Sequence, residues 1–146
     1  MPDFDLVIRN GTVATASDVF AADLGIIGGR IAALGKNLGP GREEVDATGK
    51  LVLPGGVDTH AHIHEPRSGP TRNPDDFASG SASAAAGGTT TVIGFARQPK
   101  GGSLAEAVAE HHARARSSRI DYSFHMILTD PRPAVLREEL PPLVEA

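Results

Sequence analysis

The sequence contains no cysteine and no tryptophan, and only 4% of its residues are aromatic. The absence of cysteine excludes disulfides and thiolate metal sites, so any transition-metal site must use histidine together with carboxylate or water. Such a donor set is typical of an exchangeable catalytic site rather than of a closed structural one. Because aromatic residues are scarce, the core must be built mainly from aliphatic side chains.

A large charge and a long apolar run are also missing. The formal net charge is -4, which gives no electrostatic basis for binding nucleic acid or an anionic membrane. No apolar run approaches the roughly 20 residues that cross a membrane, and the acidic N-terminus lacks the features of a secretion signal. The sequence therefore predicts a cytoplasmic protein that binds neither nucleic acid nor membrane. Its 146 residues correspond to about one ordinary domain.

Residues 1–53 read as short strands joined by tight turns, and they predict part of a small β-sandwich domain. Asn10-Gly11 is typical of a hairpin turn, and Gly28-Gly29 predicts a second one. About fifty residues form only a small core, so we expect this region to need partner strands from elsewhere.

Strands and helices alternate in residues 54–146. Strands are expected at about 57–62, 89–95 and 122–128, and helices at about 76–86, at 103–117 and after Asp130-Pro131. Asn73 or Asp75 is expected to cap the first helix, Ser103 opens a capping box for the second, and Pro141-Pro142 is expected to interrupt the last.

This alternation predicts an α/β fold with parallel strands and helices packed outside them. Residues 54–146 are interpreted as the first three β/α units of a (β/α)8 barrel of the TIM type. A complete barrel needs roughly 250 residues, so the barrel is incomplete and the chain is expected to be the N-terminal part of a larger protein.

The main candidate site is the pair His60 and His62, at the end of the first expected parallel strand, where barrel enzymes place their sites. Side chains two apart in an extended chain point to the same side, so two imidazoles there can chelate one metal ion. The alternative is that both merely hydrogen-bond nearby carbonyls. A bound metal would activate water for attack on an amide, although a catalytic zinc normally needs at least three protein ligands.

Neighbouring polar residues have two interpretations each. Asp58 either orients an imidazole as an acceptor or makes a hydrogen bond at the strand end, and Glu65 is also close by. His64 is a third ligand only if the strand stays extended, and otherwise it is a loop or substrate-facing residue. Arg67 either pairs with an anionic group of the substrate or is a solvated loop charge.

The other histidines have structural interpretations. His111 and His112 lie on a polar helix and are expected on a solvated face. His125 is mid-strand and is expected to be a hydrogen-bonded core histidine. The sequence shows no Ser-His-Asp order and no helical His-Glu-x-x-His motif.

The segment Pro54-Gly55-Gly56-Val57-Asp58-Thr59-His60-Ala61-His62 resembles the metal signature of the amidohydrolase superfamily. Residues 75–93 and 121–126 are similar to its dihydropyrimidinase/hydantoinase branch, and residues 5–13 are similar to the β-sandwich lead-in of those enzymes. The resemblance implies a hydrolase that opens a small cyclic amide or ureide, such as a dihydropyrimidine or a hydantoin. It also implies two divalent ions, usually zinc, bridged by a carboxylated lysine with a hydroxide between them. His60 and His62 match the pair that binds one ion.

The resemblance places the bridging lysine, the second ion's histidines and a catalytic aspartate outside this sequence, so the chain alone is expected to be inactive. It also implies a homo-oligomer, commonly a tetramer. The sequence departs from the branch in three places: residues 62–66 are nearer the dihydroorotase and allantoinase style, Arg67 replaces a frequent Gly, and Gly94 replaces a frequent Asp. The alternatives are therefore an allantoinase- or dihydroorotase-like cyclic amidase, or a non-catalytic dihydropyrimidinase-related assembly subunit, although such subunits usually lack the histidine pair.

Overall fold

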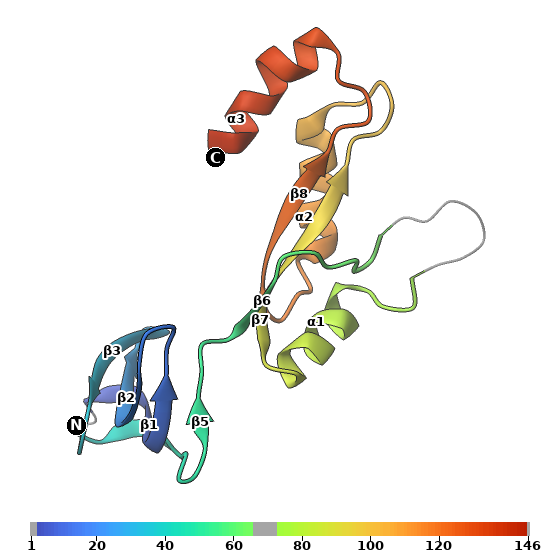
Figure 1. Cartoon of the computed structure of the whole chain (residues 1–146). Coiled ribbons are helices and arrows are strands. Elements are labelled where there is room, and N and C mark those ends of the chain that lie inside the picture. The colour runs from blue at the N-terminus through green and yellow to red at the C-terminus, as the bar shows by residue number, and fades with distance from the viewer. Residues whose placement is uncertain (1–2, 66–72, 146) are drawn as a thin grey trace. The chain divides into compact units, whose positions relative to one another are not determined.

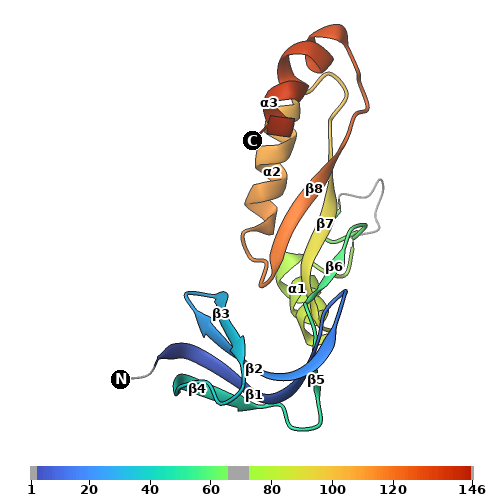
Figure 2. The same ribbon diagram turned by 60° about the vertical axis from the view of Figure 1, so that its left-hand side comes forward.

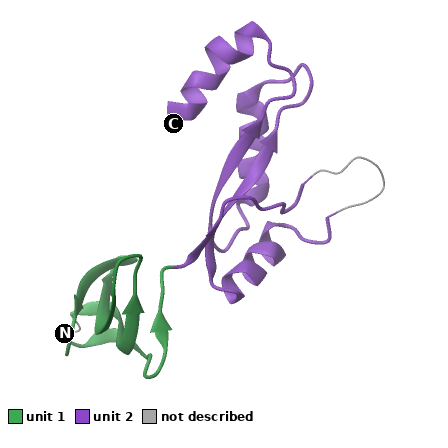
Figure 3. Cartoon of the chain, in the orientation of Figure 1, with its two compact units in different colours: residues 1–54 green, residues 55–146 purple. Residues whose placement is uncertain are grey.

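The computed structural model describes residues 3–65 and 73–145, which belong to two compact units, residues 1–54 and 55–146 (Figures 1 and 3). The first unit contains β1 (Phe4–Ala14), β2 (Val19–Ile27), β3 (Arg30–Gly35), β4 (Gly41–Asp46) and β5 (Leu51–Val52). The second unit contains β6 (Gly56–Asp58), α1 (Phe77–Ala86), β7 (Thr89–Arg97), α2 (Leu104–Ala115), β8 (Asp121–Ile127), a π-helical turn η1 (Val135–Glu139) and α3 (Leu140–Glu145). None of the helices in these described ranges is long and apolar enough to cross a membrane.

The first unit is one mixed sheet with strand order β3-β2-β1-β4, in which β5 pairs with the far end of β1. β2 runs antiparallel to β1 and β3, whereas β4 and β5 run parallel to β1, and β1 and β2 bend along their length (Figure 2). Its buried core consists of Val13, Ala22 and Leu24, with Ile8 and Val52 packed against it. The described strands of this unit form a single sheet, so the second layer of the predicted sandwich is not among them. The sandwich remains a prediction.

The prediction of a hairpin at Asn10-Gly11 is wrong, because β1 continues through these residues. The pairing of β1 with β2 shifts register between Ile8 and Gly11, and Asn10 adopts a left-handed φ of 61°. A bulge needs the same conformational freedom as a tight turn, so the local sequence signal is the same for both.

The Asn10 backbone N–H donates to Asp23 (2.9 Å), which is the main reason that the pKa of this carboxyl is lowered. Gly28 and Gly29, with φ of 56° and 73°, do form the expected turn between β2 and β3.

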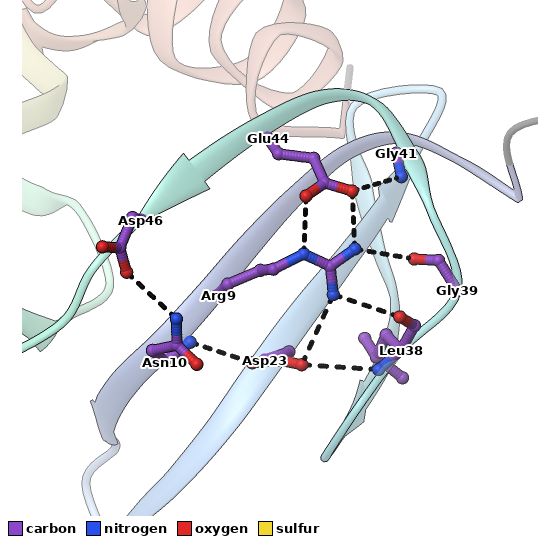
Figure 4. A network of polar contacts seen from close by, with 8 residues as sticks. All are labelled: Arg9, Asn10, Asp23, Leu38, Gly39, Gly41, Glu44 and Asp46. Atoms are coloured by element: carbon purple, nitrogen blue, oxygen red, sulfur yellow. Dashed lines mark hydrogen bonds and ion pairs between the residues drawn. The ribbon is translucent and has the colours of Figure 1, made fainter.

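A polar network centred on Arg9 joins β1 to β4 and to the preceding loop (Figure 4). The guanidinium binds Glu44 through two nitrogens, at 2.7 and 2.5 Å, and donates to the carbonyls of Leu38 (3.1 Å) and Gly39 (3.2 Å). It also lies 3.7 Å from Asp23 on β2. This pairing lowers the pKa of Glu44 from its ordinary 4.5 to about 2.

The second unit is an α/β layer whose parallel sheet has the order β6-β7-β8, with α1 packed on β7 and α2 packed on β7 and β8 (Figure 1). The parallel strands and the helix-to-strand alternation confirm the predicted α/β class for this region. Buried apolar side chains lie on both the sheet and the helices: Phe77, Val92, Ala96, Leu104, Ala107, Ala115 and Val135. Whether these units open a (β/α)8 barrel remains a prediction.

The helix caps differ in detail from the expected ones. Asp76, rather than Asn73 or Asp75, caps α1 in a reciprocal capping box with Ser79, and the Ser79 N–H lowers the pKa of this carboxyl. Ser103 caps α2 by accepting from the Ala105 N–H at 3.1 Å. The helical segment at the end of the chain is not interrupted at Pro141-Pro142. A π-helical turn precedes the prolines, which lie in the first turn of α3, where a missing N–H costs little.

Candidate functional site

His60 and His62 lie just beyond β6, because the strand itself ends at Asp58. The chain still runs beside β7 at this point, since the Ala61 N–H donates to the Ile93 carbonyl at 3.0 Å. β6 and β7 are parallel, so the pair leaves the sheet at the edge where the carboxyl ends of the strands meet. Ligand sites of parallel α/β sheets lie at this edge.

The two imidazole rings lie together, with centroids 5.1 Å apart and planes at 60°. Phe95 on β7 contacts both, edge-to-face with His60 at 4.6 Å and stacked on His62 at 5.0 Å. The ring of His125 on β8 lies 5.3 Å from the same Phe95. Four rings from three parallel segments therefore form one aromatic cluster at the carboxyl edge of the sheet.

Hydrogen bonds hold the backbone of the pair, and a carboxylate lies against one of its rings. The Asp58 carboxylate accepts from the His60 backbone N–H at 3.0 Å and so closes the turn after β6. The contact to an imidazole is made by Glu65, whose Oε1 lies 2.9 Å from Nδ1 of His62. The amide of Asn73 donates to the His62 carbonyl at 3.1 Å. Sequence reasoning noted Glu65 as a neighbour but assigned it no role, because a loop conformation decides whether it reaches the ring.

His64 does not continue an extended strand. Its φ is 51°, in the left-handed region, and its ring lies 6.1 Å from that of Phe77. Within the described residues no group of three histidine or carboxylate side chains is placed to hold a metal ion. Arg67 lies outside the described residues.

Two of the other histidines differ from expectation. His125 is exposed rather than in the core, although its Nε2 is hydrogen-bonded, 2.9 Å from the Thr59 carbonyl. His111 is buried, with Nδ1 2.8 Å from the Ala107 carbonyl and an Nε2 that has no partner among the described residues. Its position follows from helical spacing, since it shares the buried face of α2 with Leu104 and Ala107. His112 is exposed, as expected.

The donor set fits a divalent ion. His62 presents its Nδ1 to a carboxylate, which leaves Nε2 as the nitrogen with a free lone pair, as in many metal-binding histidines. The His62 side chain is 53% exposed, so water or an ion can reach it. Two imidazoles supply part of a ligand set and not the whole of one.

No protein-family model matches the chain. Among characterised proteins, it is 46% identical over 135 residues to a D-hydantoinase of Ralstonia pickettii and 42% identical over 127 residues to a dihydropyrimidinase of Dictyostelium discoideum. These alignments cover 92% and 85% of this chain but only 29% and 25% of the relatives, so the chain spans less than a third of their length.

Solved structures show the same relationship. The chain superposes on D-hydantoinase from a Bacillus species with a TM-score of 0.91 and 44% identity, covering 97% of this chain and 31% of the other. For dihydropyrimidinase from Brevibacillus agri the TM-score is 0.89 with 45% identity, covering 94% and 30%. These similarities confirm the resemblance to the hydantoinase/dihydropyrimidinase branch.

Proposed function

Over most of its length this chain is similar in sequence to hydantoinases and dihydropyrimidinases, and on that premise we propose that it is part of a metal-dependent hydrolase that opens a cyclic amide ring. The observation that carries the proposal is the pair of imidazole rings 5.1 Å apart at the carboxyl edge of a parallel sheet. The relatives are named for hydantoins and dihydropyrimidines, so a small ring of this kind is the proposed substrate class.

His60 and His62 would hold one divalent ion, for which zinc is the proposed identity, and a second ion would be held by residues outside this sequence. A bound ion of this kind supplies Lewis-acid polarisation of a carbonyl and an activated water at neutral pH. The relatives' names state their substrates and no metal, so the metal chemistry rests on the donor set itself.

The chain's own residues would prepare this site. The Asp58 carboxylate holds the backbone of His60, and the Glu65 carboxylate holds Nδ1 of His62. Phe95 packs against both rings and restricts their rotation. None of these residues transfers a proton to substrate in the proposed function, so catalytic groups would come from the rest of the complete enzyme.

The finer architecture belongs to the same proposal. Residues 1–53 would form part of a small β-sandwich domain and residues 54–146 the first three β/α units of a (β/α)8 barrel, in a cytoplasmic homo-oligomer. The exposed apolar side chains of Val19, Ile31 and Leu51 in the first unit support additional strands packing there. Val57 on the edge strand β6 is also 59% exposed, as an incomplete barrel would require.

Zinc binding tests the proposal. The 146-residue chain is expected to bind Zn²⁺ measurably by calorimetry, and the double variant with His60→Ala and His62→Ala is expected to lose that binding. His112→Ala, at an exposed histidine on α2, is the matched control and should bind like the wild type. A wild type that binds no zinc, or a double variant that binds equally, contradicts the proposal.

Ring opening tests the reaction. The 146-residue chain by itself is expected to open no ring, whereas a longer polypeptide that carries this sequence should open hydantoin or dihydrouracil to the N-carbamoyl product, followed by chromatography. Preference for allantoin or dihydroorotate would favour the allantoinase- or dihydroorotase-like alternative. A zinc-free longer protein without hydrolysis would favour the non-catalytic subunit.

A further inference from the structure

We propose that Glu65 is the positioning residue for the metal-binding nitrogen of His62, and that His64 is the backbone hinge that brings Glu65 to it. The inference rests on the proposed function, because it concerns how the same histidine pair is prepared. In this proposal the backbone conformation of His64, and not its imidazole, is what contributes to the site.

The contact between Glu65 and His62 selects one form of the imidazole. A carboxylate cannot donate a hydrogen bond, and its negative charge repels a bare ring lone pair, so the 2.9 Å contact of Oε1 with Nδ1 favours the form with the proton on Nδ1. The other nitrogen, Nε2, then carries the free lone pair that a metal ion needs. The Glu65 side chain is only 27% exposed, which shields this contact from competing water.

The contact cannot form in an extended chain. Residues three apart on a strand point to opposite sides and lie roughly 10 Å apart, so Glu65 would turn away from His62. His64 removes this obstacle, because its φ of 51° breaks the extended conformation between His62 and Glu65. The His64 ring is meanwhile placed 6.1 Å from the Phe77 ring, where it packs against the start of α1.

Two further contacts hold the loop in this conformation. The His62 carbonyl accepts from Asn73 at 3.1 Å, just before α1. Ile63, between the hinge and His62, packs against α1, since a Cβ added at Gly80 would lie 3.0 Å from the Ile63 side chain. The two residues that lead into the hinge are therefore both anchored to neighbouring structure.

The protonation of His62 is the first readout, and it needs no metal. In the metal-free chain labelled with ¹⁵N-histidine, long-range ¹H–¹⁵N correlation spectra at a pH where the rings are neutral should show His62 protonated on Nδ1. Glu65→Gln should shift His62 towards a mixture of the two forms, because a carboxamide either donates or accepts. Glu106→Gln, at an exposed carboxylate on α2, is the control and should leave His62 unchanged. A wild-type His62 protonated on Nε2 overturns the proposal.

The hinge is tested by a pair of substitutions. His64→Gly removes the ring but readily adopts a positive φ, whereas His64→Val keeps a side chain that strongly disfavours it. We expect His64→Gly to keep the Nδ1-protonated form of His62 and His64→Val to lose it, with circular dichroism confirming that both fold. Equal behaviour of the two variants overturns the hinge.

Zinc affinity separates this inference from the proposed function. Loss of the partner that orients a ligating histidine typically weakens metal binding by roughly 10- to 100-fold, and we expect that loss for Glu65→Gln and His64→Val but not for His64→Gly. If the wild type binds zinc and Glu65→Gln binds it equally, the positioning role alone is wrong. If His64→Gly loses zinc while His62 keeps its form, the His64 imidazole is itself a ligand, and the statement that only its backbone matters is wrong. A wild type that binds no zinc overturns the proposed function, and the positioning role falls with it.

Discussion

The rings of Phe95 and His62 lie stacked, with centroids 5.0 Å apart and planes 23° apart. The same phenylalanine meets His60 edge-to-face at 4.6 Å, so one side chain from β7 contacts both rings of the candidate pair. The pair itself lies on a loop after β6, where the Ala61 N–H pairs with the backbone of β7. The order of the two imidazoles therefore depends on the neighbouring strand as well as on their own segment.

Replacing Phe95 with leucine should loosen the pair. One aromatic contact of this kind contributes about 0.5–1.5 kcal/mol, so each contact that holds a ring in place is worth up to about tenfold in zinc affinity. Calorimetric titration with Zn²⁺ measures the change. Phe20→Leu, at a phenylalanine 38% exposed in the first unit, is the matched control. Unchanged affinity in Phe95→Leu would show that the rings are held by the loop alone.

The sequence predicted most of the second unit because alternating apolar runs and caps are local signals. It placed β7, α2 and β8 correctly, and Ser103 does cap α2, although its hydroxyl accepts from the Ala105 N–H and not from that of the expected capping-box partner Glu106. The prediction from sequence failed where one local pattern is compatible with two different structures. Asn10-Gly11 marks a bulge inside β1 rather than a turn, and the Pro141-Pro142 pair follows a π-helical turn rather than ending a helix.

The candidate site was predictable in its position and not in its contacts. Period-two spacing puts His60 and His62 together, and their rings do lie side by side. The contact from Glu65 depends on the left-handed φ of His64, which no spacing rule indicates for histidine. The burial of His111 was predictable from the spacing of apolar residues on α2, but its charged neighbours in the sequence masked that pattern.

Acid should weaken the first unit through Glu44. The Arg9 guanidinium, followed by the Gly41 N–H, lowers the pKa of this carboxyl from 4.5 to about 2. Because the folded-state pKa is depressed, the stabilisation is complete above the unfolded value of 4.5 and is lost as the pH falls towards 2. Urea unfolding can be measured across this pH window by NMR signals from β1 and β4. As the pH falls, the free energy of unfolding should decrease less in Glu44→Gln than in the wild type. Glu43→Gln, at an exposed carboxylate outside the network, should keep the wild-type slope, and equal slopes in all three proteins would contradict the pairing.

The carboxylate of Glu139 should stabilise α2 from outside the helix. It accepts from the Leu104 N–H at 2.7 Å, so a residue of η1 satisfies a free donor in the first turn of α2. Loss of a capping acceptor costs about 1 kcal/mol, and Glu139→Ala should lower the free energy of unfolding by that amount. Tyr122 is the single tyrosine of a chain without tryptophan, so its fluorescence reports on the second unit. Glu138→Ala, at the exposed neighbour, should unfold like the wild type, and an equal loss in both variants would exclude a specific cap.

Among the polar residues of the second unit, Gln98 is the one whose substitution should lower the stability most. It is 1% exposed, and its side chain joins the loop after β7 to the loop after β8 at the carboxyl edge of the sheet. Its Oε1 accepts from the backbone N–H groups of Thr129 (3.3 Å) and Asp130 (3.1 Å). Its Nε2 donates to the carbonyls of Gly102 (3.1 Å) and Asp130 (3.4 Å).

This arrangement predicts that an isosteric change at Gln98 is worse than an apolar one. Gln98→Leu leaves buried backbone groups unpaired, each costing about 1–3 kcal/mol. Gln98→Glu keeps the acceptor but places a carboxylate oxygen against two carbonyls, so the buried charge is repelled as well as desolvated. Urea unfolding followed by Tyr122 fluorescence should therefore rank the glutamate variant below the leucine variant, and both below Ser123→Ala, an exposed control on β8. A glutamate variant as stable as the wild type would mean that water reaches the Gln98 amide and that the two loops are not joined through it.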